Sequence, residues 1–357
     1  MLGVLLTALI LAGCATTPKP PPGPTPAEVR ADIARRIPAS AKDRDGWATD
    51  IQIAFQAQGI TPNPENICAV LAVLEQESGY TADPAVPNLG RIARKEIEDR
   101  AASMHIPKFA VAAALKVKST DGRSYEERLS KVRTEHELSA LYEDLIGRVP
   151  LGQRLFANKN PVQTGGPMQV SIAFAQANTR GYPYPVQGSI RDEVFTRRGG
   201  MYFGIAHLLG YETPYTRKVH RFADYNAGRY ASRNAAFQGA VTQATGISLA
   251  LDGDLLVPGA SLNQPGLTET AVRSLAAKLG MNERQIRREL ERSNRLDFND
   301  TQLYARVFAL GEAAAGKPLP RAVIPGITLE SPKITRELTT AWFAERVNGR
   351  YRQCLGR

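Results

Sequence analysis

The acidic residue Glu77 lies where the sequence allows a carboxyl group to transfer a proton. The apolar residues before it recur at the helical spacing i, i+3, i+4 and i+7: Ile67, Val70, Leu71 and Leu74. A carboxylate at the end of such a buried helix loses contact with water and faces the negative end of the helix dipole, and both effects raise its pKa. A carboxyl group with a raised pKa can give up a proton near neutral pH. The alternative is an ordinary exposed glutamate at a fraying helix end.

Capping residues mark both ends of the helix that carries this acid. Asn63 suits the N-cap, Pro64 suits the first helical position, and Gly79 suits the position just after the end. At about 100° per residue, the acid and Ser78 stay on the apolar side of the helix, whereas Glu75 falls at its outer margin. The pattern therefore predicts that two nearby acids point in different directions.

Further helices are predicted around this one. Residues 45–58 carry apolar side chains at helical spacing up to Gly59, and we expect them to pack on the helix of the acid. Helical spacing also fills 193–209 and opens 222–233.

A long insertion and an irregular segment lie between these elements. Residues 81–159 are predicted to form an inserted helical subdomain, and its amphipathic patches are 92–104, 109–117 and 125–149. Residues 158–177 then break the helical pattern, because two glycines and a proline predict a turn and 168–172 alternates like a short strand. We expect a functional loop there.

Three separated strings stand in a definite order: QESGY at 76–80, GGPMQVS at 165–171 and ADYNAG at 223–228. In this order they resemble the ES, GLMQ and AYNAG motifs of the soluble-type lytic transglycosylases, a lysozyme-like family. The string GGMYFGIAHLLGY at 199–211 also resembles the helix that precedes the third motif in that family. As a whole, the chain is similar to an uncharacterised family of proteobacterial lipoproteins.

The resemblance implies roles for individual residues. Glu77 would be the single catalytic acid, and Ser78 would help to hold it. Four residues of the other two motifs would contact the glycan or position the acid: Met168, Gln169, Tyr225 and Asn226. One acid suffices in this family, because the N-acetyl group of the substrate takes the part of the second carboxylate that ordinary glycosidases need. The acid then draws the proton from the muramyl C6 hydroxyl, which closes a 1,6-anhydro ring.

The resemblance thus predicts an enzyme that cleaves the MurNAc–GlcNAc bond of peptidoglycan glycan strands without a cofactor. Two alternatives remain open: a non-catalytic peptidoglycan-binding lipoprotein that keeps the groove, and a scaffold that recruits wall enzymes through its helical insertion and tail. A third is a hydrolytic muramidase, in which Asp224 would position water if it faced the cleft. We expect Asp224 to point to solvent, because it is adjacent to Tyr225 and out of phase with it.

The amino terminus predicts export and lipidation. Residues 1–14 are an apolar run that is too short to span a bilayer and that is typical of a signal peptide. The run ends in LAGC, which resembles the lipobox of bacterial lipoproteins and makes Cys14 the lipidated residue. Residues 15–38 are predicted as a Pro-rich tether. By the same resemblance, Ala15 directs the protein to the outer membrane, lipid-anchored and facing the periplasm.

The net positive charge of the chain indicates that it works next to polyanionic molecules. The chain of 357 residues is 43% hydrophobic and 22% charged, with a formal net charge of +10. An exported lipoprotein meets peptide carboxylates of the wall and anionic lipopolysaccharide rather than nucleic acid.

The helices predicted at 268–279 and 283–294 resemble a helix-turn-helix in spacing. The i,i+4 pairs Glu283–Arg287 and Glu291–Arg295 indicate a solvated face instead, which argues against DNA binding.

The remaining two cysteines and the four histidines do not have the spacing of a metal site. Cys68 and Cys354 predict either one disulfide or two buried free thiols. The histidines lack metal-ligand spacing, so no metal site is expected: His105, His136, His207 and His220.

The predicted fold class is mainly α. We expect a lysozyme-like catalytic domain over 39–251, which includes the insertion at 81–159, and a helical C-terminal extension over 252–357. The boundary is placed where Gly and Pro are frequent, at 252–266.

Overall fold

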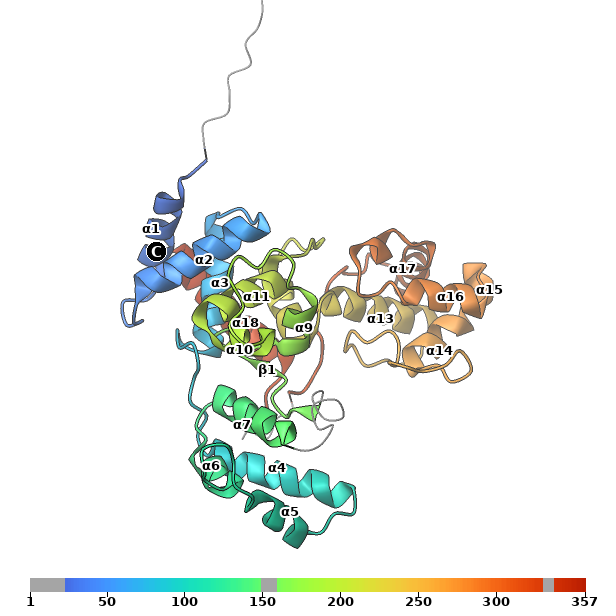
Figure 1. Cartoon of the computed structure of the whole chain (residues 1–357). Helices are drawn as coiled ribbons and strands as arrows, with labels where there is room; N and C mark the ends of the chain where they lie inside the picture. The colour runs from blue at the N-terminus through green and yellow to red at the C-terminus, as the bar shows by residue number, and fades with distance from the viewer. Residues whose placement is uncertain (1–22, 149–158, 330–336) are drawn as a thin grey trace, which may run out of the picture.

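The computed structural model describes residues 23–148, 159–329 and 337–357, and the fold is mainly α-helical with one short hairpin (Figure 1). The predicted signal peptide and Cys14 lie outside the described residues. Among the helices of the described ranges, none combines the length and the apolar character that crossing a bilayer requires.

The first helix corrects the predicted extent of the tether. Residues 26–36 lie within the predicted tether 15–38, but they form α1 (Pro26–Arg36), and its side chains Val29 and Ile33 are buried in the main core. The helix begins with a capping box, in which Thr25 and Glu28 satisfy each other's backbone N–H groups. This local signal outweighs the Pro-rich composition before it.

The main core is built by helices from both ends of the chain. Its elements are α1, α2 (Arg44–Gln58), α3 (Pro64–Glu77), α9 (Ile172–Ala177), α10 (Ile190–Phe195), α11 (Arg197–Leu209), α12 (Lys218–Ala227) and α18 (Thr340–Leu355). The helix α3 packs on α18, which also packs on α12, while α2 packs on α1 and α11. The helix predicted over 193–209 is interrupted at Thr196, which ends α10 and caps α11 with its hydroxyl.

The predicted insertion forms the lobe at the bottom of Figure 1, and its buried side chains are continuous with the main core. It contains α4 (Leu89–Ser103), α5 (Lys108–Leu115), α6 (Tyr125–Lys131) and α7 (Glu135–Gly147). The patch predicted as one helix over 125–149 is two helices, because Thr134 takes the N-cap of α7 in a capping box with Glu137. A hairpin of β1 (Thr164–Gly165) and β2 (Val170–Ser171) follows, with Gly165 paired to Val170.

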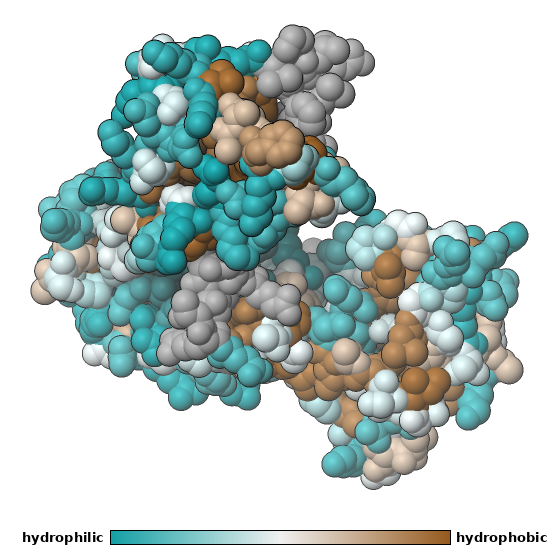
Figure 2. Space-filling view, turned by 90° about the horizontal axis from the view of Figure 1, so that it is seen from below, coloured by the Kyte–Doolittle hydropathy of each residue, from teal (hydrophilic) through white to brown (hydrophobic). Residues whose placement is uncertain are grey.

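A second core lies to the right in Figure 1, and Figure 2 shows this lobe joined to the rest of the molecule by a narrower neck. Its elements are α13 (Ala231–Thr245), α14 (Leu267–Ser274), α15 (Ala276–Leu279), α16 (Glu283–Leu290), η2 (Leu296–Asp300) and α17 (Gln302–Ala315). The core begins with Ala236 on α13, ahead of the Gly- and Pro-rich segment 252–266.

Ion pairs in this lobe differ from the predicted i,i+4 pairs. Arg287 bonds to the buried carboxylate of Glu269, which Arg273 also contacts, rather than to Glu283. Glu283 pairs with Arg273 at 2.9 Å. The arginine therefore neutralises a buried acid, and it is not a solvated surface partner.

A disulfide joins the two ends of the main core. Cys68 of α3 is bonded to Cys354 of α18, and their Cα atoms are 5.5 Å apart. Arg36 lies against the bridge, because its guanidinium donates to the Cys354 carbonyl at 3.2 Å. The C-terminal helix thus belongs to the core that carries Glu77, although the second lobe intervenes in the chain between α12 and α18.

Candidate functional site

Glu77 is the last residue of α3, and the helix brings it out of the core. Residues 67–74 are all buried, whereas Glu77 itself is half-buried. Gly79 follows with a φ of 57°, the left-handed conformation that ends many helices. Among the described residues, Glu77 has no hydrogen-bond or ion-pair partner. Burial raises the pKa of its carboxyl group to about 7, so protonated and ionised forms coexist near neutral pH.

Glu75, two residues earlier, has a different environment. Its carboxylate lies 3.5 Å from the guanidinium of Arg350 on α18, which also donates to Gln76 at 2.7 Å. The ion pair keeps Glu75 on the α18 side of the helix. Of the two neighbouring acids, Glu77 is therefore the one without a cation beside it.

Ser78 closes the end of the helix. Its hydroxyl donates to the Leu74 carbonyl at 3.2 Å and accepts from the backbone N–H of Thr81 at 3.4 Å. These contacts hold the backbone on both sides of Glu77. The side chain thus acts on the helix end that carries the acid, through the backbone.

Tyr225, in the third motif, is hydrogen-bonded to the second motif. Its hydroxyl donates to the carbonyl of Met168 at 2.6 Å, and both side chains are buried. Burial, and next the negative charge of Glu77, raise the pKa of Tyr225 well above its ordinary value, which places the ring in the electrostatic neighbourhood of the acid. Tyr225 is thus bonded to Met168 and lies within range of the charge of Glu77.

Glycines of α11 make room for the second motif. A Cβ atom at Gly204 would come within 2.6 Å of the Met168 Cβ, and one at Gly200 would come within 2.8 Å of the Pro167 ring. A larger residue at either position would push the loop away from α11. The glycines of the segment 199–211 therefore set how deeply Met168 is seated.

Gln169 is held by two side chains in a left-handed backbone conformation, with a φ of 50°. Its amide nitrogen donates to Glu135 at 2.9 Å, and its amide oxygen accepts from the Thr164 hydroxyl at 3.2 Å. Glu135 is only 4% exposed and is the first residue of α7 in the insertion. Glu135 could not be predicted as part of the site, because no sequence signal relates it to Gln169, which lies 34 positions later in the chain.

Asn226 is exposed and is tied to the C-terminal helix. Its side-chain oxygen accepts from the Thr340 hydroxyl at 3.0 Å, at the start of α18. Among the described residues, this is the contact that orients it. The third motif is thus anchored by a helix that lies more than a hundred residues later in the chain.

Asp224 does not point to solvent as predicted. It is fully buried, and its carboxylate accepts from the Tyr215 hydroxyl at 2.6 Å and from the backbone N–H groups of Tyr230 at 2.9 Å and Ser232 at 2.7 Å. Burial raises the pKa of Asp224 although these hydrogen bonds oppose the shift. The expectation was wrong because it assumed a helix with one apolar face, whereas residues 222–225 of α12 are all buried.

His207 is the histidine beside the site. Its ring lies 4.9 Å from that of Tyr225, and its Nε2 lies 3.2 Å from the Tyr225 carbonyl. Burial, and next the positive charge of Arg229, lower the pKa of His207 to about 4. The ring is therefore neutral near pH 7 and acts as packing. Over the described ranges, no group of three or more metal-ligating side chains could hold a metal ion.

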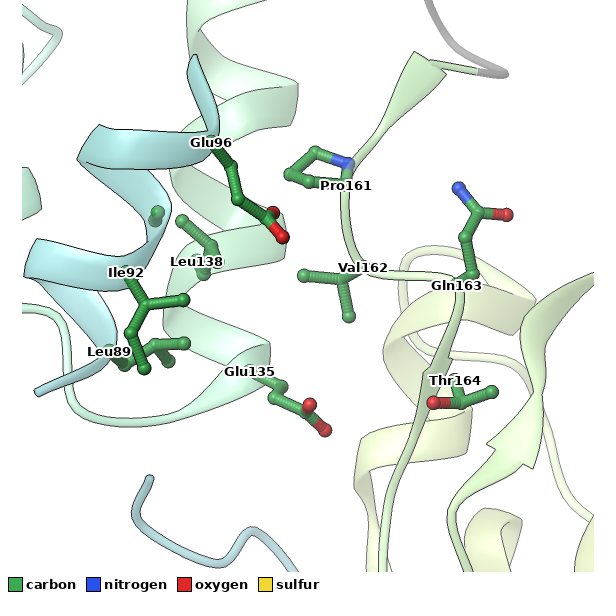
Figure 3. A pocket seen from close by; sticks show the side chains of 10 residues that line it. Leu89, Ile92, Glu96, Glu135, Leu138, Pro161, Val162, Gln163 and Thr164 are labelled. Atoms are coloured by element: carbon green, nitrogen blue, oxygen red, sulfur yellow. The ribbon is translucent and has the colours of Figure 1, made fainter. Parts of the chain in front are cut away.

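A cavity of about 160 Å³ lies on the insertion side of Gln169 (Figure 3). It is bounded by α4, α7 and the segment that leads into β1, and its lining residues include Ile92, Glu96, Glu135, Leu138, Val162 and Thr164. Glu77 is not among the residues that line it. The acid and the cavity are connected through Tyr225, the loop of the second motif and Gln169.

The fold and this site define an α-helical protein with an unpaired carboxyl group at the end of α3 and a hydrogen bond that joins the second and third motifs. The family model described as "Protein of unknown function (DUF1615)" matches residues 40–357, so the chain belongs to this family. It is also 55% identical over 353 residues to "Uncharacterized protein YaiW" of Escherichia coli (strain K12), covering 98% of this chain and 96% of the relative. No solved structure matched the chain.

Proposed function

We propose that this protein is a lysozyme-like lytic transglycosylase that cleaves the MurNAc–GlcNAc bond of peptidoglycan. The observation that carries the proposal is the state of Glu77, an unpaired acid with a pKa of about 7 at the end of a buried helix. A general acid works best when its pKa lies near the working pH. The hydrogen bond from Tyr225 to Met168 and the effect of the Glu77 charge on Tyr225 support a site built from the three motifs.

The proposed reaction uses one carboxyl group twice. Protonated Glu77 gives its proton to the glycosidic oxygen while the bond from that oxygen to muramyl C1 breaks. The carboxylate then takes the proton of the C6 hydroxyl while O6 bonds to C1, which closes the anhydro ring. No water is consumed. Burial of the carboxyl group maintains its raised pKa.

The position of Asp224 favours this reaction over hydrolysis. A hydrolytic muramidase needs a second group to position water, and Asp224 was the candidate. Its carboxylate is instead occupied by Tyr215, Tyr230 and Ser232 at the corner between α12 and α13. Glu75, the acid two residues before Glu77, pairs with Arg350 and is not free to position water either.

We further propose that a lipid on Cys14 anchors the protein to the outer membrane, facing the periplasm. The lipobox string LAGC at 11–14 carries this part of the proposal. The net charge of +10 suits a protein that works against an anionic wall.

Digestion of purified sacculi tests the activity. Wild-type protein should release anhydromuramyl products, Glu77→Gln should lower the rate by about 10²- to 10⁴-fold or more, and both should bind sacculi equally. Glu75→Gln is the matched control, because it removes an acid from the same helix end, and it should retain full activity. Products with reducing muramic acid would indicate hydrolysis, and binding without any product would indicate a non-catalytic wall-binding protein. Equal activity of Glu77→Gln and wild type would overturn the proposal.

A further inference from the structure

The cavity between the insertion and the main core combines apolar walls with two acidic side chains. Figure 3 shows the carboxyl groups of Glu96, from α4, and Glu135, from α7, directed toward the space between these helices and segment 161–164. The aliphatic side chains on the walls are Leu89, Ile92, Leu138 and Val162. At about 160 Å³, the cavity has room for several water-sized groups.

Three cations on the elements that bound the cavity or on the neighbouring α10 pair with acids that do not line it: Arg94 with Glu98 and Glu126, Lys95 with Asp99, and Arg191 with Glu143. Arg191 also donates to the Val162 carbonyl at 2.8 Å, which holds it behind the wall. Glu96 forms no hydrogen bond or ion pair with any residue in the described ranges. The residues that line the cavity include two acids, Glu96 and Glu135, and no lysine or arginine.

The cavity is joined to the proposed glycan site by one hydrogen bond. Glu135, which lines the cavity, accepts from the amide of Gln169 at 2.9 Å. Thr164, on the opposite wall, donates to the other end of the same amide at 3.2 Å. A group that enters the cavity therefore lies directly behind a residue of the second motif.

We propose that this cavity binds the alkyl-ammonium end of a peptide stem attached to the glycan strand. The inference rests on the proposed function, which brings a glycan with its stems to Gln169. The methylene groups of such a side chain match the aliphatic walls, and its ammonium group matches the carboxyl groups of Glu96 and Glu135. The insertion would then select strands that carry a free diamino-acid amine.

Binding of a soluble stem peptide tests this inference without requiring glycan cleavage. The probe is L-Ala–γ-D-Glu–L-Lys, compared with the same peptide acetylated on its side-chain amine, and both are titrated calorimetrically into the full chain. Acetylation removes the charge, so the affinity should fall by roughly tenfold or more. Glu96→Gln should cause a similar loss for the free amine and no loss for the acetylated peptide.

Asp121→Asn is the matched control, because it removes a negative charge from the same lobe at an exposed position that is paired with Arg123 and does not line the cavity. It should leave both affinities unchanged. Glu135→Gln should also lower the affinity for the free amine, but it changes the hydrogen-bond partner of Gln169 as well. Glu96→Gln leaves that hydrogen bond in place, so it separates a loss of amine binding from a displacement of Gln169.

The outcomes separate this inference from the proposed function. Equal affinity for both peptides, or binding of neither, would overturn the cavity assignment even if sacculi are cleaved. Amine-dependent binding that is lost in Glu96→Gln would support the cavity assignment. If the wild-type protein shows that binding but does not cleave sacculi, only the proposed transglycosylase activity is overturned.

Discussion

The hydroxyl of Tyr225 donates a hydrogen bond of 2.6 Å to the backbone carbonyl of Met168, which joins two motifs that lie 57 residues apart. The negative charge of Glu77 also acts on this tyrosine and helps to raise its pKa. The position of the second motif therefore depends on a side chain that is itself part of the environment of the acid.

Tyr225→Phe keeps the ring and removes this bond. The buried carbonyl of Met168 loses its partner, so we expect a cost of about 1–3 kcal/mol in the free energy of unfolding. The glycan affinity should fall several-fold while Glu77 remains able to transfer a proton. Urea unfolding and sacculus-binding measurements check both effects. Unchanged stability and affinity would show that the bond does not hold the loop.

Asp224 is predicted to be structural. Asp224→Ala removes the acceptor of three hydrogen bonds at the corner of α12 and α13, including two from backbone N–H groups. We expect a loss of about 2–5 kcal/mol in the free energy of unfolding, because buried donors are left without partners. Asp224→Asn keeps one acceptor oxygen and should lose less. A variant that kept full stability but produced no anhydro product would instead indicate a direct role for Asp224 in the chemistry.

The disulfide between Cys68 and Cys354 closes a loop that spans the second lobe, with a sequence separation of 286. In the chain-entropy view, its removal costs on the order of 3–5 kcal/mol. The variant with both Cys68→Ala and Cys354→Ala should show this loss in urea unfolding, and reductant should destabilise the wild type but not the variant. Two titratable thiols in the unreduced, denatured wild type would contradict the bridge.

The predicted lipid anchor can be tested directly. Cys14→Ser should leave an unlipidated protein that is soluble or unprocessed, because the lipobox loses its acceptor thiol. Mass spectrometry of the membrane fraction should find acyl chains on wild-type Cys14 and none on the variant. Wild-type protein without an acyl chain would rule out the anchor.

The elements nearest Glu77 could be predicted because their signals are local. Asn63 caps α3 through its side chain, Pro64 begins the helix, and Gly79 follows its end in the left-handed conformation, as the residue types indicate. Thr25 and Glu28 carried a similar signal for α1, but the Pro-rich composition of the segment before it concealed the helix.

Contacts between distant segments could not be predicted in the same way. The bond from Gln169 to Glu135 spans 34 residues and depends on how the insertion folds back onto the hairpin. The return of α18 to the main core was suggested only by the cysteine pair, while its contact with Asn226 through Thr340 had no sequence signal. Periodicity assigns the faces of one helix, and it does not say which other helices cover them.

Glu77 should make both activity and stability depend on pH near neutrality. Because its pKa is raised to about 7 in the folded protein from an ordinary value of 4.5, the folded state binds more protons than the unfolded state between these two values. Stability should therefore be highest below about pH 4.5 with respect to this group, fall as the pH rises through the window, and level off above about pH 7. The loss is at most about 3 kcal/mol, and less to the extent that water reaches the half-buried side chain.

The same titration sets the activity profile. The first step needs protonated Glu77, so kcat/KM should decline by about tenfold per pH unit above pH 7. Glu77→Gln cannot titrate, so it should be more stable than wild type at pH 8 and equally stable near pH 4, whereas Glu75→Gln should follow the wild-type curve. Urea unfolding across pH 4–9 and initial rates of sacculus digestion measure the two effects. A wild-type profile without a transition near pH 7 in either measurement would show that Glu77 is an ordinary exposed glutamate, which is the alternative that its position at a helix end allowed from the start.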